Sequence, residues 1–354
     1  MIDWTKSMEQ TFDFYTVDPN TWKDDEVIET IVKDSCVIDR DLTNSTLGSA
    51  TLDSTEVLDE CYIRIYLVVI QNGETGKFPL GTFLVQTPGT SFDGKIHTYS
   101  MDAYTPLIEL KSDNPPIGYT VPKGENIMNV ATVLCRENMR APIVPATCDD
   151  TLYSNFIANL DDTWHTFISD LIYNAKYEFA LDEMGRVLFQ PIQDFASLQA
   201  VCTYNDDNSS ILHPAIKDSR DLYDIPNVVE VIYSTGTGYL FSRVVNDDPN
   251  SPISTVNRGR ELLYRETNPS VQGEPTQEYL DAYAKQLLRN KSCLEHTLTY
   301  THGYSSARVG DCVMLNYKRS GITYTKAKVI SQSIKCKTGC PVEETAVYTQ
   351  RLWG

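Results

Sequence analysis

The feature that most constrains the fold of this chain is a series of three consecutive strand patterns in its first third. Residues 62–70 are β-branched or aromatic at almost every position, which is typical of a β-strand. Turn-forming residues at 71–76 separate this strand from a second one at 78–86, and another turn leads into a third at 95–103. Three successive antiparallel strands with one polar-leaning face predict a sandwich or small barrel, so we expect a first β domain at residues 1–105.

The strand patterns then stop at a proline-containing loop, and helical patterns follow. Apolar residues at helical spacing predict a helix over residues 125–138 and a clearer one that begins after a capping Asp161 or Asp162. The second helix leads into a hairpin at residues 177–189. A helix packed against a hairpin predicts a small α+β domain at residues 106–195. The apolar stripe of the second helix consists of Trp164, Phe167, Ile168, Leu171, Ile172 and Ala175.

Strand patterns return from residue 196 and continue to the C-terminus. We expect a strand at residues 227–233 and a helix from Thr276 to Lys291, with Thr276 as its cap. The region 196–354 is therefore predicted to be β-rich, with a helical insert around 245–291. Later strand patterns cover residues 293–300, 311–317, 323–333 and 345–352. The fold class predicted from these patterns is mainly β with an α+β insert.

The charge balance argues against two classes of partner. The chain of 354 residues carries 48 acidic and 30 basic side chains, a formal net charge of −18. Phosphate contacts require Lys and Arg, so neither nucleic-acid binding nor an anionic membrane surface is expected. An acidic wall can still let DNA pass without holding it. The N-terminus lacks the basic and apolar regions of a signal peptide, and the apolar runs are too short for a membrane span.

The cysteines and histidines do not predict a metal site. Nine cysteines are scattered along the chain, and we expect them to be reduced thiols packed as small apolar groups in a protein made in a cytoplasm. Cys336 and Cys340 form a pair with an unusual gap, and no second pair follows at ligand spacing. His296 and His302 would share one face of a strand but lie roughly 20 Å apart at ~3.3 Å per residue.

No motif for catalysis or cofactor binding stands out. The sequence lacks a Gly-x-Ser-x-Gly elbow and a cysteine in a protease context. A strand follows the glycines of residues 234–238, which indicates a hairpin turn and not a phosphate cradle. The basic residues Arg258 and Arg260 make too small a patch for nucleic acid. Because carboxylates are abundant and no pair is distinguished, we predict no enzyme, no catalytic residue, no cofactor and no metal.

Four stretches from residue 164 onward, taken in order, carry a family resemblance. They are the helix and hairpin from Trp164 to Pro191, the strand Asn227–Val231, the helix Tyr279–Arg289 with the strand after it, and the segment Arg308–Leu315. This order resembles the tail hub proteins of tailed bacteriophages. That family includes the baseplate hubs of contractile tails, the late-control D proteins and the hub part of type VI secretion spikes.

The resemblance implies a structural virion protein. Each subunit of a homotrimer would contribute two tube-like antiparallel β-barrel domains, residues 1–105 and 196–354, so that six barrels match the six-fold tail tube. The α+β part would lie outside the barrels. The implied partners are other copies of the chain, the tail tube and distal tail proteins, the tape measure protein and tail-tip or spike and fibre proteins. DNA would only pass through the channel, and no membrane is involved. The protein would be made in the host cytoplasm and located at the tail tip or baseplate.

Some hub-containing proteins carry a fused lysozyme, needle or peptidase domain. This sequence ends at Trp353 and Gly354, just after the last strand pattern, so we expect no such domain here. The alternative is a carbohydrate-binding or cell-wall-degrading tail protein. Such a protein would need exposed aromatic residues beside a carboxylate cleft, and the chain is rich in tyrosine, with 21.

Overall fold

The computed structural model describes residues 2–207, 211–235, 238–269 and 276–353. The fold is mainly β, as the sequence predicted. The strands are β1 (Glu9–Val17), β2 (Asp24–Val27), β3 (Val37–Asp41), β4 (Gly48–Ser54), β5 (Tyr62–Gln71), β6 (Glu74–Phe92), β7 (His97–Tyr104), β8 (Thr120–Val121), β9 (Ile143–Val144), β10 (Phe156–Ile157), β11 (Tyr177–Leu181), β12 (Val187–Pro191), β13 (Ala200–Asn205), β14 (Leu212–Arg220), β15 (Val228–Ser234), β16 (Tyr239–Val245), β17 (Leu263–Thr267), β18 (Cys293–His302), β19 (Cys312–Tyr317), β20 (Ile322–Lys335) and β21 (Val342–Arg351). The helices are α1 (Ile108–Lys111), α2 (Ile127–Asn138), α3 (Trp164–Tyr173), α4 (Thr255–Arg258), α5 (Gln277–Lys291) and the 3-10 helix η1 (Lys318–Ser320).

The chain divides into two compact units. Unit 1 comprises Met1–Ala215 and Tyr300–Thr345, and unit 2 comprises Ile216–Thr299 and Ala346–Gly354. The chain passes from one unit to the other within β14, β18 and β21. This division differs from the boundaries that we expected at residues 105 and 195. The physical reason is the distribution of the cores: the α+β segment shares its core with strands of unit 1, whereas unit 2 encloses a core of its own.

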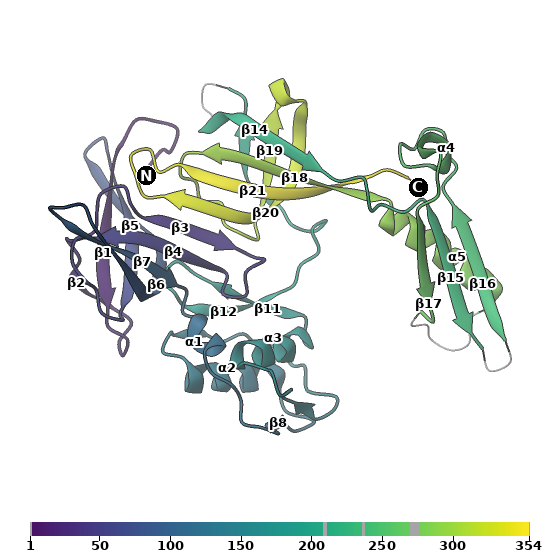
Figure 1. Ribbon diagram of the computed structural model, residues 1–354, viewed down its shortest axis with the longest axis horizontal. Helices are drawn as coiled ribbons and strands as arrows, with labels where there is room; N and C mark the ends of the chain where they lie inside the picture. Colours follow the sequence, from purple (N-terminus) through teal and green to yellow (C-terminus); the bar gives the residue numbers. More distant parts are fainter. Residues whose placement is uncertain (1, 208–210, 236–237, 270–275, 354) are drawn as a thin grey trace. The chain divides into compact units, whose positions relative to one another are not determined.

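Two groups of neighbouring strands make up the largest sheet. Strands from the first 104 residues lie in the order β2-β1-β5-β6-β7-β4-β3, and later strands lie in the order β13-β19-β20-β21-β18-β14. The groups meet where β3 and β20 pair antiparallel, with Val37 opposite Lys335 and Asp41 opposite Ser331. Figure 1 shows this seam as a purple strand beside a yellow one. Both β-rich ends of the chain therefore contribute to one sheet, and the closure of each group into a barrel remains a prediction.

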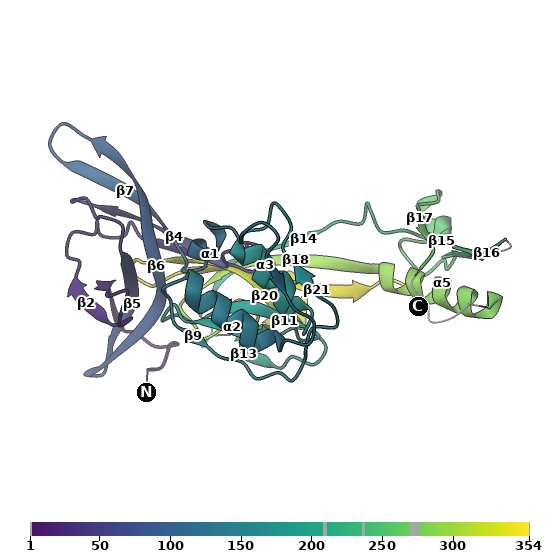
Figure 2. The same cartoon turned by 90° about the horizontal axis from the view of Figure 1, so that it is seen from below.

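The central strand of the first group is β5, the most strand-like run of the sequence. It pairs with β1 on one side and β6 on the other, and almost all its side chains are buried. β6 has 19 residues, and its outer end pairs with β7 in a hairpin with an exposed turn at Asp93 and Gly94. Figure 2 shows this hairpin projecting beyond its neighbours. The ladder shifts register between Gln86 and Pro88, where proline has no N–H to donate.

The α+β segment packs as the sequence predicted. α2 and α3 lie side by side, and α3 contacts the hairpin of β11 and β12 (Figure 1). Trp164 is only 6% exposed. The same core includes Trp22, Tyr62 and Leu84 from the first strand group, which is why the segment is not a separate unit. The core residues that α3 and the hairpin contribute are Trp164, Phe167, Ile168, Leu171, Ile172, Phe179, Val187 and Phe189, with Tyr177 partly buried beside them.

The N-cap of α3 is Thr163, so our expectation of Asp161 or Asp162 was wrong. The Thr163 hydroxyl accepts a hydrogen bond from the Thr166 amide at 3.2 Å, and the Thr166 hydroxyl accepts one from the Thr163 amide at 2.9 Å. This reciprocal capping box satisfies two backbone donors at once. Asp162 instead accepts a hydrogen bond from the Asn159 amide at 2.7 Å.

The helix expected after Thr276 is present as α5, and it packs on a sheet of unit 2. The sheet has the order β16-β15-β17, and Figure 1 shows α5 running along it. Leu280 and Leu288 are fully buried against Val229 and Val231 of β15. Leu287 is partly buried at the edge of the same cluster. Helix and sheet therefore enclose a small core of their own.

Candidate functional site

A buried polar cluster of unit 1 is built around Glu344 on β21. Its carboxylate is fully buried and accepts hydrogen bonds from the Tyr300 hydroxyl and, at 2.7 Å, from Gln332 Nε2. His302 Nε2 lies 3.2 Å from the same carboxylate. Tyr300 and His302 share one face of β18 because strand side chains alternate. Since β18 and β20 are the two neighbours of β21 in the sheet, side chains from both strands reach the carboxylate on β21.

Tyr204 extends this cluster from β13. Its hydroxyl lies 3.3 Å from His302 Nε2 and 2.8 Å from the Ser305 hydroxyl. Burial and the nearby charge of Glu344 raise the pKa of both Tyr204 and Tyr300. Both phenols therefore stay protonated at neutral pH, and Tyr300 serves as a hydrogen-bond donor inside the protein.

An ion cluster of Arg40, Glu183 and Arg308 adjoins the polar cluster. Arg40 Nη1 donates to Gln332 Oε1 at 3.2 Å, and Arg308 pairs with Glu183. Burial, followed by the charge of Arg308, lowers the pKa of Arg40 to about 10. Burial opposes ionisation of Glu183, but Arg308 and Arg40 outweigh it and lower the pKa of Glu183. The cluster ties β3, the turn between β11 and β12, and the loop before β19 together.

A cavity of about 600 Å³ lies beside the ion cluster in unit 1. Glu183, Arg308, Asp311 and Lys328 are among its charged lining residues. Burial raises the pKa of Asp311, whose carboxylate accepts a hydrogen bond from the Arg308 amide at 2.9 Å. Because Glu183, Arg308 and Asp311 already have partners within the protein, the arrangement is suited to holding three segments together. Sequence reasoning missed this junction because its residues are far apart along the chain and form no local motif.

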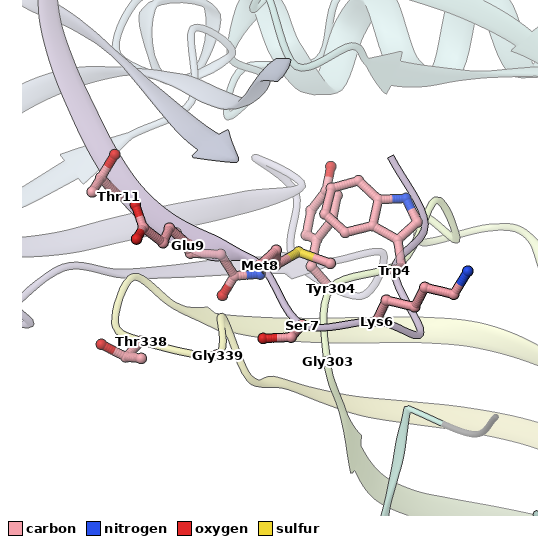
Figure 3. A pocket seen from close by; sticks show the side chains of 11 residues that line it. Trp4, Lys6, Ser7, Met8, Glu9, Thr11, Gly303, Tyr304, Thr338 and Gly339 are labelled. Atoms are coloured by element: carbon pink, nitrogen blue, oxygen red, sulfur yellow. Dashed lines mark hydrogen bonds between the residues drawn. The ribbon is translucent and has the colours of Figure 1, made fainter. Parts of the chain in front are cut away.

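A second cavity of unit 1, about 590 Å³, is a groove along the N-terminal segment (Figure 3). Its lining residues include Trp4 and Met8 from the N-terminal segment, and Tyr304 and Gly339 from two later parts of the chain. The Trp4 ring packs against Tyr304, with 4.9 Å between ring centroids, and against Phe78 at 5.0 Å. The start of the chain, the loop after β18 and the turn after β20 therefore meet at this groove.

The residues weighed as metal ligands have other contacts. His296 lies 3.0 Å from Asp218 and 3.2 Å from Gln350, and it stacks on Tyr348 with 4.5 Å between centroids. His302 belongs to the Glu344 cluster, and Cys336 and Cys340 are buried. Within residues 2–207, 211–235, 238–269 and 276–353, no group of three or more potential ligands is placed to hold a metal ion.

The remaining sequence candidates have structural positions. Arg258 donates to the backbone carbonyl of Ile225 at 2.6 Å, so the small basic spot is partly used within the protein. β15 and β16 pair antiparallel up to Ser234 opposite Tyr239, as expected for a hairpin around residues 234–238. Residues 236 and 237 of that turn lie outside the described residues.

The aromatic surface gives little support to sugar stacking by tryptophan. Trp22 and Trp164 are buried, and Trp4 and Trp353 are half-buried. The exposed aromatics are instead tyrosines such as Tyr153 and Tyr324 and phenylalanines such as Phe92, with Tyr239 and Phe241 together on β16. In the described part of the chain, the helices are all too short or too polar to span a membrane.

Comparison with solved structures identifies the class of fold. The tail protein from Neisseria meningitidis matches with a TM-score of 0.61 and 14% identity, covering 97% of this chain and 98% of that one. The 43 kDa tail protein of prophage MuSo2 from Shewanella oneidensis matches with a TM-score of 0.60 and 14% identity, covering 96% of this chain and 98% of that one. This chain therefore has a fold found in phage tail proteins, as the resemblance implied.

The same fold occurs in a larger assembly protein. A chain of the Francisella PdpA–VgrG complex matches with a TM-score of 0.54 and 9% identity, covering 97% of this chain and 52% of that one. This chain thus spans about half of that longer protein. No protein-family model and no curated protein sequence matches the chain.

Proposed function

We propose that this chain is a structural subunit of a phage tail. The observation that supports the proposal is the nearly complete mutual coverage with the Neisseria tail protein, 97% of this chain and 98% of the other. A match of this extent includes both strand groups, the α+β segment and unit 2, so it is not limited to a single shared motif. The role needs no catalysis, and we assign no catalytic residue.

Within that role, we propose a homotrimeric hub at the tail tip or baseplate. A three-fold ring can cap a six-fold tube if each subunit presents two near-equivalent docking surfaces. The two strand groups, β2 to β3 and β13 to β14 in sheet order, are the candidates for these surfaces. Each group would close into a barrel-like domain, and six of them in a trimer would match the six subunits of a tube ring.

The hub would leave a channel for DNA. The net charge of −18 supports this part of the proposal, because an acidic wall repels phosphates and clustered Lys or Arg would hold them. The proposed partners are the tail tube and distal tail proteins, the tape measure protein and tail-tip or spike and fibre proteins. The proposed location is the tail of the virion, after synthesis in the host cytoplasm.

A cryo-EM map of the tail tip, combined with native mass measurement of the purified chain with and without its tube protein, tests this proposal. We expect three copies at the tip, with each strand group against one tube subunit. Absence from the tail, or one copy per tube ring, would overturn the hub. A cell-wall zymogram tests the alternative, a cell-wall-degrading tail protein. The chain would be an enzyme if the purified protein lyses cell walls and a single Asp or Glu substitution abolishes the lysis.

A further inference from the structure

We propose that Cys36 and Cys336 are an oxidisable pair that forms a disulfide across the seam between β3 and β20. The cross-link would form after the protein leaves a reducing cytoplasm. That timing rests on the proposed function as a virion subunit, whereas the pairing of the two thiols rests on geometry alone. The bond would connect the first strand group to the second.

The register of the β3–β20 ladder places the two cysteines opposite each other. Ile38 lies opposite Ile334 and Val37 lies opposite Lys335, so the next position pairs Cys36 with Cys336. The Cys336 amide donates to the Cys36 carbonyl at 2.9 Å, which extends the ladder to this position. Directly opposite residues of an antiparallel ladder have Cα atoms about 4.5–5.5 Å apart, within the roughly 4.4–6.8 Å that a disulfide requires.

The two side chains lie in the same core. Cys36 is 1% exposed and Cys336 is 3% exposed, and both belong to the core of the first strand group. The hydrogen bond between their thiols, followed by burial, raises the pKa of Cys336 well above its ordinary value. Oxidation is therefore slow in the closed structure, since the thiolate is the reactive form. Cys340, also buried, is the third thiol of this cluster.

A short exposed turn provides access to the pair. Lys337, Thr338 and Gly339 separate Cys336 from Cys340 and are exposed. Thr338 and Gly339 also line the groove shown in Figure 3. The turn is closed by a backbone hydrogen bond from Cys340 to Lys337 at 2.8 Å. Local opening of this turn would bring solvent from the groove to Cys336 without separating β3 from β20.

The chemistry requires a small-molecule disulfide as oxidant. The Cys336 thiolate attacks one sulfur of the small disulfide, and a mixed disulfide forms as the first small thiolate leaves. The Cys36 thiolate then attacks the Cys336 sulfur, the second small thiolate leaves, and the protein disulfide forms. Both cysteine sulfurs are oxidised, both sulfurs of the small disulfide are reduced, and the two cysteine protons end on the released thiols.

The test uses the purified full-length chain, reduced, desalted and then incubated under native conditions with oxidised glutathione. Remaining thiols are alkylated, and peptides are mapped by mass spectrometry without reduction. We expect two of the nine thiols to be lost and a peptide that links Cys36 to Cys336. We also expect the oxidised chain to unfold at a higher temperature than the reduced chain. Cys336→Ser and Cys36→Ala should each abolish the linked peptide and the shift.

Two further variants control for the identity of the pair. Cys340→Ser should retain the Cys36–Cys336 link, and so should Cys135→Ser, which removes a buried thiol from a different core. A link between Cys336 and Cys340, or nine free thiols after prolonged oxidation, would overturn the proposal. The outcomes are separable from the hub: a trimer at the tail tip with nine free thiols refutes only the cross-link, and a cross-linked chain absent from the tail refutes only the hub.

Discussion

The hydroxyl of Tyr300 donates a hydrogen bond to the fully buried carboxylate of Glu344, across the neighbouring strands β18 and β21. A buried carboxylate is costly unless donors surround it. Here Gln332 of β20 donates a second hydrogen bond, and His302 Nε2 of β18 lies 3.2 Å from the same carboxylate. The interior of the second strand group therefore contains hydrogen-bonded polar side chains as well as apolar ones.

Removing the Tyr300 donor should destabilise the protein. Tyr300→Phe leaves one oxygen of the buried carboxylate without this partner, and we expect the free energy of unfolding to fall by about 1–3 kcal/mol. Urea denaturation measures the change. Tyr324→Phe is the matched control, because Tyr324 is 64% exposed and its loss should have little effect. Equal effects of the two substitutions would contradict the structural role of the cluster.

Stability should fall at high pH because buried tyrosines hold their protons more tightly in the folded protein. Burial and Asp24 raise the pKa of Tyr66 to about 12, and the pKa values of Tyr204 and Tyr300 are raised as well. In the unfolded chain, tyrosines titrate near pH 10. The contribution of these tyrosines to the free energy of unfolding is therefore complete below about pH 10. It is lost as the pH rises towards their pKa in the folded protein.

Denaturation at a series of pH values, with tyrosinate absorbance as a second signal, checks this expectation. The free energy of unfolding should decline steadily above about pH 10, and Tyr66→Phe should make the decline shallower. A free energy of unfolding that stays constant to about pH 12 would be inconsistent with the buried phenols.

Asp24 should matter more than other carboxylates on the first strands. Arg64 is 1% exposed and its Nη1 lies 2.6 Å from Asp24 Oδ1, so Asp24→Ala leaves a buried charge without its counter-ion. Because the Asp24 side chain is 29% exposed, we expect a loss of about 3 kcal/mol, the lower end for such pairs. Asp13→Ala breaks the exposed pair with Lys77 and should cost under about 1 kcal/mol. Thermal and urea unfolding of both variants measure the difference.

Trp164 should be a large contributor to the α+β core. The ring is 6% exposed and packs edge-on against Tyr119, with 5.1 Å between centroids. Trp164→Ala should lower the free energy of unfolding by about 3–5 kcal/mol. Tyr153→Ala is the control, since Tyr153 is 90% exposed and should change stability by less than about 0.5 kcal/mol. A tolerated Trp164→Ala would show that the ring does not carry the core.

Two glycines with positive φ should differ in their response to alanine. A Cβ at Gly185 would lie 2.7 Å from the Thr82 Cβ, whereas a Cβ at Gly94 would meet nothing within 4 Å. Both substitutions impose backbone strain of about 1–3 kcal/mol, and Gly185→Ala adds a collision at the contact between the β11–β12 turn and β6. We expect Gly185→Ala to be clearly the more destabilising in urea unfolding. The reverse order would contradict the close packing of this turn.

Local elements with a strong hydrophobic period or a strand-like composition follow from the sequence alone. The β-branched run of β5, the apolar stripe of α3 and the capped α5 are each encoded within a few residues, so they were predictable one at a time. The order of these elements also carried the resemblance to tail hub proteins, and comparison with solved structures agrees with it at the level of fold. The cap of α3 was misjudged because Asp162 and Thr163 are both good capping residues, and local geometry selects Thr163.

Contacts between residues far apart along the chain are visible only in the folded structure. The pairing of β3 with β20 joins positions about 300 residues apart, and no local pattern states that Cys36 will lie beside Cys336. The same holds for Glu344 with Tyr300, and for Glu183 with Arg308. The boundary of unit 2 could not be predicted either. The apolar stripe of α5 would fit a barrel or a small sheet equally well, and the structure shows that it packs on the small sheet of unit 2. Hydrophobic periodicity specifies that one face of a helix or strand is buried. Which element covers that face depends on how the whole chain packs.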